Sequence, residues 1–328
     1  VLGAGAWGTA MAAALSARHC VVLYARNAEQ CAQLTRNHIN TRYLPAFSLP
    51  AALRFTDDLH AALNRGASAP GLTLIATPTD ALRSVVRAVS ETAPPAPLVW
   101  LCKGLEQSSG QLPHQIVREE LGDRANTGPL SGPSFASEVA CGLPSALTVA
   151  GAPEFCEHVT EALHFGAMRI YSTDDVVGVE VGGAVKNVMA IATGISDALA
   201  LGLNARAALI TRGLAEMTRF GIALGARGET FMGLTGIGDL ILTATGDLSR
   251  NRKVGLALGR GAPMQAAVEE LGHVAEGVRS AHAVLARARG SNIDMPITEA
   301  VCAVLDGALT PAEALYALLA REPKVEVK

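Results

Sequence analysis

The sequence predicts an α/β domain over residues 1–175 followed by an all-α domain over residues 176–328. In the first part, short apolar runs alternate with segments of helix length, a pattern typical of βαβ units. From about residue 174 onward, long Ala/Leu/Gly-rich stretches with short breaks replace that alternation. A chain of 328 residues also exceeds one ordinary hydrophobic core. No low-complexity linker separates the two parts, so we expect a packed junction near 174–180.

The α/β part should form a mostly parallel sheet whose ligands bind at the carboxyl ends of the strands. Apolar and β-branched runs predict five strands, at 20–25, 72–77, 97–102, 146–151 and 168–172. Helical segments between them are expected at 79–90 and 153–165. In the second part, helices are expected at 183–201, 205–224, 264–271, 277–289 and 296–306.

Composition excludes several classes of protein. Hydrophobic residues make up 49% and charged residues 17%, which indicates a packed globular chain rather than a disordered one. The net charge of −3 argues against nucleic acid or an anionic membrane as the main partner. No uncharged apolar run has the length of a membrane span, so we expect no membrane insertion. The sequence does not begin with Met, and we expect a few residues to precede Val1.

The six cysteines are scattered and show no metal-binding spacing. We therefore expect reduced thiols in a cytoplasmic protein, and no metal site.

Near the start, "VLGAGAWG" places Gly3, Gly5 and Gly8 in a GxGxxG pattern. The pattern needs a tight turn at Gly3, close approach of a pyrophosphate at Gly5 and helix–strand packing at Gly8. A helix follows directly and then the strand at 20–25, which is the context that gives this otherwise weak motif its meaning. We expect a Rossmann-type domain with the pyrophosphate at the N-terminus of the first helix.

The end of the strand expected at 20–25 bears on the choice of cofactor. An NAD-preferring site usually has an acidic residue there, whereas this chain has Arg26 and Asn27, with no acid before Glu29. An arginine can pair with a 2′-phosphate, so we expect NADP(H) to be preferred and NAD(H) to be usable. The alternative is a solvated Arg26 in an ordinary loop.

Polar turns also follow two later strands. "LVWLCKGLE" puts Lys103 directly after an apolar strand, and "GPLSGPSFASE" presents Gly132 and Ser134 before a helix. Each could be ordinary turn chemistry. Together, at one end of a sheet and beside a glycine loop, they favour a site for an anionic or hydroxylated ligand.

The segment "VGGAVKNVMAIATGIS" contains a single charge, Lys186. On a helical wheel, Thr193 and Asp197 lie within about 20° of Lys186, and Gly182 and Gly183 lie one turn earlier, leaving room above the lysine. Burial would lower the pKa of Lys186 and make it a usable proton donor or acceptor. The alternative is a lysine that snorkels to water.

A second polar group follows in "GIGDLILTATGDLSRNRKVG". Asp239 opens an apolar helical turn, and Ser249, Arg250 and Asn251 lie in a loop before the next helix, beside Arg252 and Lys253. Three cations in four residues at a helix entrance suggest a local phosphate site. A solvated basic turn is the alternative.

Several motifs together resemble one family. In chain order they are "GAGAWGTA", "CKGLE", "SGPSFA", "GGAVKNVMAIATGISD", "TFMGLTGIGDLILT", "SRNRKVG" and "VAEGVRSA". Across essentially the whole chain they resemble the bacterial NAD(P)-dependent glycerol-3-phosphate dehydrogenases. The resemblance implies reversible hydride transfer between NAD(P)H and dihydroxyacetone phosphate, giving sn-glycerol 3-phosphate for phospholipid synthesis.

The resemblance also assigns site residues. It makes Lys186 the general acid/base and Asp239 its partner, where the helical wheel alone would offer Asp197 instead. Positions that match substrate contacts are Lys103, Gly132, Ser134, Lys186, Asp239, Ser249, Arg250 and Asn251. Positions that match cofactor contacts, besides the three glycines, are Ala6, Trp7, Arg26, Lys103, Ala136, Arg250, Val274 and Glu276.

Two other functions remain open. A related dehydrogenase acting on a hydroxy acid or hydroxyacyl thioester would share this architecture, but "SRN" and the lack of a carboxylate clamp disfavour it. A redox-sensing module that only binds NAD(P)H would not need Lys186, Asp239 and Ser134 together. A homodimer is expected from the apolar helices of the second part.

Overall fold

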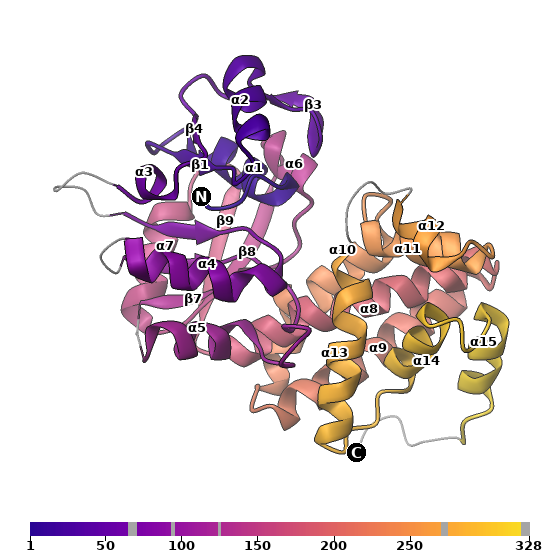
Figure 1. The fold of residues 1–328 in the computed structure, drawn as a ribbon. Coiled ribbons are helices and arrows are strands. Elements are labelled where there is room, and N and C mark those ends of the chain that lie inside the picture. Colours follow the sequence, from indigo (N-terminus) through magenta and orange to yellow (C-terminus); the bar gives the residue numbers. More distant parts are fainter. Residues whose placement is uncertain (65–70, 93–95, 124–125, 270–274, 323–328) are drawn as a thin grey trace.

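The computed structural model describes residues 1–64, 71–92, 96–123, 126–269 and 275–322, and it shows two parts joined side by side (Figure 1). The N-terminal part is a sheet with helices on both faces. The C-terminal part consists of helices. The expected fold class is confirmed.

The N-terminal sheet is mostly parallel. One pair consists of β1 (Val22–Tyr24) and β4 (Arg54–Thr56), and a run of five neighbouring strands consists of β5 (Thr73–Ile75), β6 (Leu98–Trp100), β7 (Thr127–Ser131), β8 (Ser145–Ala150) and β9 (Met168–Thr173). Leu2 bridges Tyr24 and Ile75 and so connects the two groups. The β7–β8 pair is antiparallel and the other pairs in these groups are parallel. All five expected strands are present, with ends that differ by up to two residues.

Alternation along the strands explains why helices cover both faces. Leu74 and Val99 point into one apolar cluster, whereas Ile75 and Trp100 point into another. The first cluster is completed by α1 (Ala6–Leu15), α2 (Ala28–Asn37), α6 (Ala136–Ala140) and α7 (Pro153–Leu163). The second is completed by α3 (Leu59–Leu63), α4 (Thr79–Thr92) and α5 (Pro113–Leu121). A hairpin of β2 (Ile39–Asn40) and β3 (Leu44–Ser48) lies outside the main sheet.

The helical part is built around α8 (Val176–Ala198), whose residues from Gly178 to Ser196 are all buried. Around it lie α9 (Gly202–Ala223), the turns η1 (Gly228–Met232) and η2 (Leu234–Gly238), α10 (Asp239–Thr245), α11 (Arg250–Gly259), α12 (Met264–Glu269), α13 (Glu276–Gly290), α14 (Pro296–Leu305) and α15 (Pro311–Leu319) (Figure 1). Helix α8 begins seven residues before the expected start at 183. Its N-cap is Asp175, which accepts a hydrogen bond from the Gly178 amide at 2.9 Å, so capping and burial outweigh the poor helix propensity of the valines that follow. The last two residues of the helix expected at 264–271 lie outside the described residues.

Glycines let α11 lie directly against α8. A Cβ on Gly194 would come within 2.1 Å of the Arg252 carbonyl oxygen, and one on Gly255 within 2.1 Å of the Ile191 carbonyl oxygen. Within the described residues, α8 is also the single helix long and apolar enough to span a bilayer, yet 89% of its most apolar window lies buried inside the protein. It is therefore the core helix of the second part.

Candidate active site

The glycine turn has the three properties that the sequence predicts. Gly3 has φ +116°, a conformation that favours glycine, and a Cβ on Gly8 would come within 2.0 Å of the Gly3 carbonyl oxygen. A Cβ on Gly5, in contrast, would meet no atom of the described residues within 4 Å, so none of them fills the space in front of it. Gly5 is also the N-cap of α1, and no side chain in the described part of the chain caps that helix. A pyrophosphate fits this open helix N-terminus.

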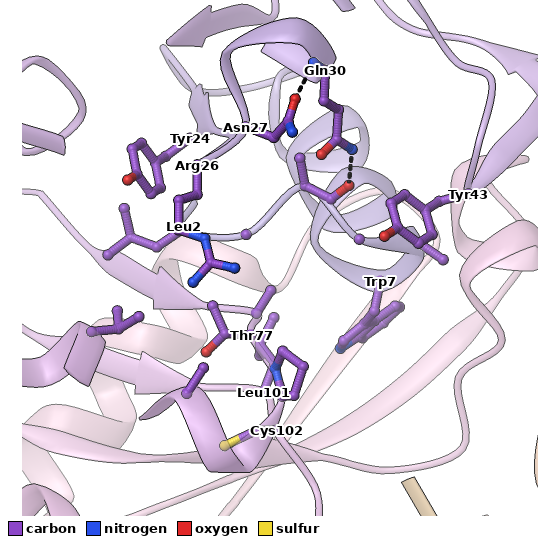
Figure 2. A pocket seen from close by; sticks show the side chains of 18 of the residues that line it. Leu2, Trp7, Tyr24, Arg26, Asn27, Gln30, Tyr43, Thr77, Leu101 and Cys102 are labelled. Carbon is purple, nitrogen blue, oxygen red and sulfur yellow. Dashed lines mark hydrogen bonds between the residues drawn. The ribbon is translucent and has the colours of Figure 1, made fainter. Parts of the chain in front are cut away.

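A cleft of about 870 Å³ extends from this turn to the helical part. It brings together eight of the predicted site residues, namely Gly3, Gly5, Ala6, Trp7, Arg26, Lys103, Arg250 and Glu276. Trp7 and Tyr43 flank one side of the cleft and Tyr24 and Arg26 another, with Thr77 and Cys102 below them (Figure 2). A dinucleotide could therefore lie across the carboxyl ends of the strands, as expected for this fold.

Two polar residues that sequence reasoning missed hold the glycine turn in place. The side-chain amide of Gln30 donates to the Ala4 carbonyl oxygen at 2.8 Å (Figure 2), and that of Asn40 donates to the same oxygen at 3.0 Å and to the Thr9 hydroxyl at 2.8 Å. They lie 26 and 36 residues from Ala4 along the chain, so no local motif contains them.

Arg26 lies two residues after the end of β1 and is exposed, whereas Ala25 between them is buried. Figure 2 shows its guanidinium pointing into the cleft toward Thr77, and among the described residues no carboxylate lies within ion-pair distance of it. Asn27 caps α2, accepting a hydrogen bond from the Gln30 amide at 2.8 Å. Glu29 lines the same cleft.

Lys186 does not snorkel to water. Its side chain is 9% exposed, and its Nζ lies 2.6 Å from Asp239 Oδ1 and 2.9 Å from the Thr243 hydroxyl oxygen. The expected contact with Asp239 is therefore present. Asp239 is the first residue of α10, directly after the π-helical turn η2, an irregularity that occurs often at functional sites.

One carboxylate faces two ammonium groups. Asp239 Oδ2 accepts a hydrogen bond from Lys103 Nζ at 2.8 Å, while Oδ1 binds Lys186. Burial lowers the pKa of Lys186 to about 8, with Asp239 opposing and Lys103 adding to the decrease. Burial alone would raise the pKa of Asp239, but the two ammonium groups hold it below its usual range. Lys103 also lines the cleft, so the buried pair lies next to the cofactor site.

Two features read from the helical wheel are wrong. Asp197 is bound to Arg206 at 2.7 Å and to Arg252 at 2.8 Å, and Thr193 donates to the Ala190 and Ala244 carbonyl oxygens.

The space beside Lys186 is also filled by the protein. A Cβ on Gly182 would come within 2.2 Å of the Thr235 carbonyl oxygen, and one on Gly183 within 3.3 Å of Lys103.

The turn after β7 meets Lys103. Gly132, with φ +144°, accepts hydrogen bonds at its carbonyl oxygen from Lys103 Nζ at 3.2 Å and from the Ser134 hydroxyl at 3.0 Å. Ala136 is the first residue of α6 and packs, like Trp7, on the apolar cluster of the sheet. Gly132, Ser134 and Ala136 do not line the cleft itself.

At the entrance of α11, the three cations differ in their surroundings. Arg250 is exposed and lines the cleft, and Lys253 is exposed. Arg252 is buried and paired with Asp197 and Asp247, so it is not free to bind a phosphate, contrary to the cluster of three that the sequence suggests.

The loop expected over Ser249, Arg250 and Asn251 ends at Ser249, because Arg250 and Asn251 are the first two residues of α11. Ser249 is the buried N-cap of α11, and Asn251 lies in its first turn, where its side chain binds the Asn187 side chain and the Gly277 amide, both at 2.9 Å. Gly277 follows Glu276, the first residue of α13, whereas Val274 lies outside the described residues.

Comparisons with known families cover most of the chain. Residues 1–156 match the model of the NAD-dependent glycerol-3-phosphate dehydrogenase N-terminus, and residues 175–316 match that of the C-terminus.

Curated relatives agree with the family models. The chain is 59% identical over 328 residues to the glycerol-3-phosphate dehydrogenase [NAD(P)+] of Burkholderia orbicola, covering 99% of each chain, and 59% identical over the same span to that of Burkholderia cenocepacia. A crystal structure of glycerol-3-phosphate dehydrogenase from Coxiella burnetii superposes with a TM-score of 0.92 at 41% identity, covering 98% of both chains.

Proposed function

The chain belongs to the NAD-dependent glycerol-3-phosphate dehydrogenase family, and from this premise we propose which of its residues carry out the reaction. It is an NAD(P)-dependent oxidoreductase that transfers hydride reversibly between NAD(P)H and dihydroxyacetone phosphate, and it supplies sn-glycerol 3-phosphate for phospholipid synthesis. The observation that carries the proposal is the buried Lys186–Asp239 pair next to the cofactor cleft.

Lys186 is the general acid/base at the C2 oxygen. A nicotinamide cofactor held in the cleft would supply the hydride chemistry at C2, and reduction there would leave negative charge on the carbonyl oxygen. An ammonium group beside that oxygen stabilises the charge and donates the proton that completes the alcohol. A pKa of about 8 keeps Lys186 mostly protonated near neutral pH while allowing it to give up the proton.

Asp239 orients Lys186 and keeps it protonated. It does so through the hydrogen bond at 2.6 Å, and its second oxygen holds Lys103 in the same way. Two ammonium groups and one carboxylate leave an excess of one positive charge, which suits an anionic substrate and an oxyanion transition state.

The phosphate of the substrate binds near the entrance of α11. Arg250 provides the exposed guanidinium there. The Ser249 hydroxyl accepts from the Arg252 amide and still has its own hydrogen to donate, and the Asn251 side-chain amide has a second N–H. Gly132 and Ser134 complete the substrate site from the turn after β7.

The cofactor lies along the cleft. Gly3, Gly5, Ala6, Trp7 and Gly8 would hold its pyrophosphate, and Lys103, Ala136, Arg250 and Glu276 would contact the rest of it. Val274, which the family resemblance also assigns to the cofactor, lies outside the described residues. Arg26 favours NADP(H) over NAD(H), because its guanidinium points into the cleft and can pair with a 2′-phosphate. The domains are 1–175 and 176–328, a division supported by the start of α8 at Val176.

Two properties beyond the reaction complete the proposal. The free cysteines fit the reducing environment of the cytoplasm. A homodimer is also part of the proposal, and the exposed apolar side chains at the two ends of α9, Leu203 and Ile222, are compatible with it.

The reaction can be tested directly with the purified protein. Dihydroxyacetone phosphate should cause oxidation of NADPH, followed by the loss of nicotinamide absorbance, and a 2-oxo acid should not. Absence of turnover with dihydroxyacetone phosphate by folded protein that binds NADPH would overturn the proposed reaction. Turnover with the 2-oxo acid alone would instead identify a hydroxy-acid dehydrogenase.

A further inference from the structure

Glu180 is a buried carboxylate that the reaction, as described above, does not use. It lies on α8, and its side chain is 1% exposed. Its Oε1 accepts hydrogen bonds from Trp100 Nε1 at 2.9 Å and from the His114 backbone amide at 2.8 Å, and its Oε2 lies 2.6 Å from His114 Nδ1. All these partners belong to the α/β part, Trp100 to β6 and His114 to the first turn of α5.

The arrangement needs explanation because a buried carboxylate is costly. Burial raises the pKa of Glu180, and hydrogen bonds from His114 and Trp100 oppose that rise. Burial would lower the pKa of His114, but Glu180 raises it above its usual value. An apolar contact would join the two parts without this cost, so the directional bonds point to a requirement for one fixed geometry.

The two lysines of the site lie close by, Lys186 on α8 and Lys103 in the turn after β6. Trp100 lies three residues before Lys103, and Glu180 lies six residues before Lys186. The lysines in turn meet on the two oxygens of Asp239. The Glu180–Trp100 bond and the two bonds of Asp239 therefore join the same two segments of the chain, residues 100–103 and residues 180–186.

We propose that Glu180 is a positioning residue for the reaction, because its bond to Trp100 fixes β6 against α8 and so sets the separation of Lys103 and Lys186 around Asp239. This inference rests on the proposed roles of the two lysines. Glu180 touches neither substrate nor cofactor and acts only through the elements that it joins.

Releasing this contact has a defined electrostatic consequence. The charged groups that face Lys186 are Asp239 from α10, Lys103 from the turn after β6 and Glu276 from α13. The two ammonium groups repel each other and would separate if β6 could move. Since Lys103 lowers the pKa of Lys186, separation raises that pKa.

The test compares Glu180→Leu with a matched control, Glu216→Leu. Glu216 is also a buried carboxylate with three hydrogen bonds, but it receives them from Ile297 and Thr298 within the helical part. We expect Glu180→Leu to lower kcat for dihydroxyacetone phosphate reduction by about 10- to 100-fold, in line with the effect of displacing a reacting group by about 1 Å. At high pH, kcat/KM should fall as Lys186 loses its proton. In Glu180→Leu this high-pH limb of the profile should move to higher pH. Glu216→Leu should lower the melting temperature and leave that limb in place.

Two milder variants keep the test decisive if Glu180→Leu does not fold. Glu180→Gln retains an acceptor for Trp100, and Trp100→Phe removes the indole donor together with part of the buried ring. Both should shift the high-pH limb in the same direction by a smaller amount. An unchanged limb and unchanged kcat in folded Glu180→Leu or Trp100→Phe, which lose the bond, would overturn the positioning role. An inactive wild-type protein would instead refute the proposed reaction, so the two failures are distinguishable.

Discussion

The ammonium of Lys186 and the carboxylate of Asp239 lie 2.6 Å apart in the interior of the protein, and Asp239 binds Lys103 at 2.8 Å with its other oxygen. Sharing one carboxylate between two ammonium groups leaves each lysine incompletely neutralised. Burial makes this costly for the free protein, and an anionic substrate oxygen would relieve the cost. The same relationship determines what should follow when either partner is changed.

Replacing Lys186 with Met should remove the proton donor while keeping a side chain of similar length. We expect kcat to fall by about 10²- to 10⁴-fold, the usual contribution of a general acid. NADPH binding, measured by fluorescence titration, should change little, because Lys186 does not line the cofactor cleft.

Lys253→Met serves as the matched control, because Lys253 is an exposed lysine at the entrance of α11. It should keep nearly normal turnover. Near-normal turnover by Lys186→Met itself would remove Lys186 from the acid/base role.

Asp239→Asn should change the pH dependence of the reaction as well as its rate. The carboxylate raises the pKa of Lys186, whereas burial and Lys103 lower it. Without the negative charge the pKa of Lys186 falls below about 8, and the protonated lysine needed for reduction is lost at lower pH. The high-pH limb of kcat/KM should therefore move to lower pH, opposite to its shift in Glu180→Leu. A limb that stays in place would contradict the coupling of Asp239 to Lys186.

How far the sequence predicts this site depends on how local each feature is. The glycine turn is predicted correctly, because its spacing contains the geometry that a βα turn requires. The helical wheel fails for Asp197 because it ignores the rise along the axis. Eleven residues of helix separate Asp197 from Lys186 by about 16 Å, too far for a contact. Asp239 emerges instead from the family resemblance, since it lies 53 residues away along the chain.

Contacts between distant segments are also the ones that sequence reasoning misses. Gln30 and Asn40 hold the Ala4 carbonyl, and Glu180 binds Trp100 across 80 residues of sequence. No periodicity or motif records such pairs, because they are set by how the sheet and α8 pack together. Arg252 shows the same effect, since the partly buried Asp197 neutralises a cation that looks available in the sequence.

Arg26→Asp should change the preference for the cofactor. A carboxylate at this position repels a 2′-phosphate and can accept a hydrogen bond from a ribose 2′-hydroxyl. We expect the Kd for NADPH to rise by at least about tenfold, a loss typical of one charge-assisted contact, while the Kd for NADH stays the same or falls. Arg36→Asp is the control, because Arg36 is exposed on α2 and does not line the cleft. An equal rise of the Kd for NADPH in both variants would show that only the overall charge of the protein affects NADPH binding.

Glu216 should make the stability of the helical part depend on pH. Burial raises the pKa of Glu216 to about 7, although the Ile297 and Thr298 amides at the start of α14 donate to it. A carboxyl group with a raised pKa in the folded state stabilises the fold most below its unfolded pKa of about 4.3, and this contribution is lost as the pH rises toward 7. The change amounts to roughly 4 kcal/mol.

Urea unfolding of the wild type and of Glu216→Gln tests this pH dependence. The free energy of unfolding should be measured between pH 4 and pH 8, about the range over which the group titrates. The substituted side chain cannot titrate and loses one acceptor, so the wild type should be more stable near the low end, and its advantage should shrink as the pH rises. Glu313→Gln provides a control of opposite sign. The exposed Glu313 caps α15 by accepting a hydrogen bond from the Thr310 amide, and this bond lowers the pKa of Glu313. The stabilisation by Glu313 is therefore lost as the pH falls. An advantage of the wild type over Glu216→Gln that is constant or grows with pH would show that Glu216 is ionised throughout, with the helix N-terminus outweighing the effect of burial.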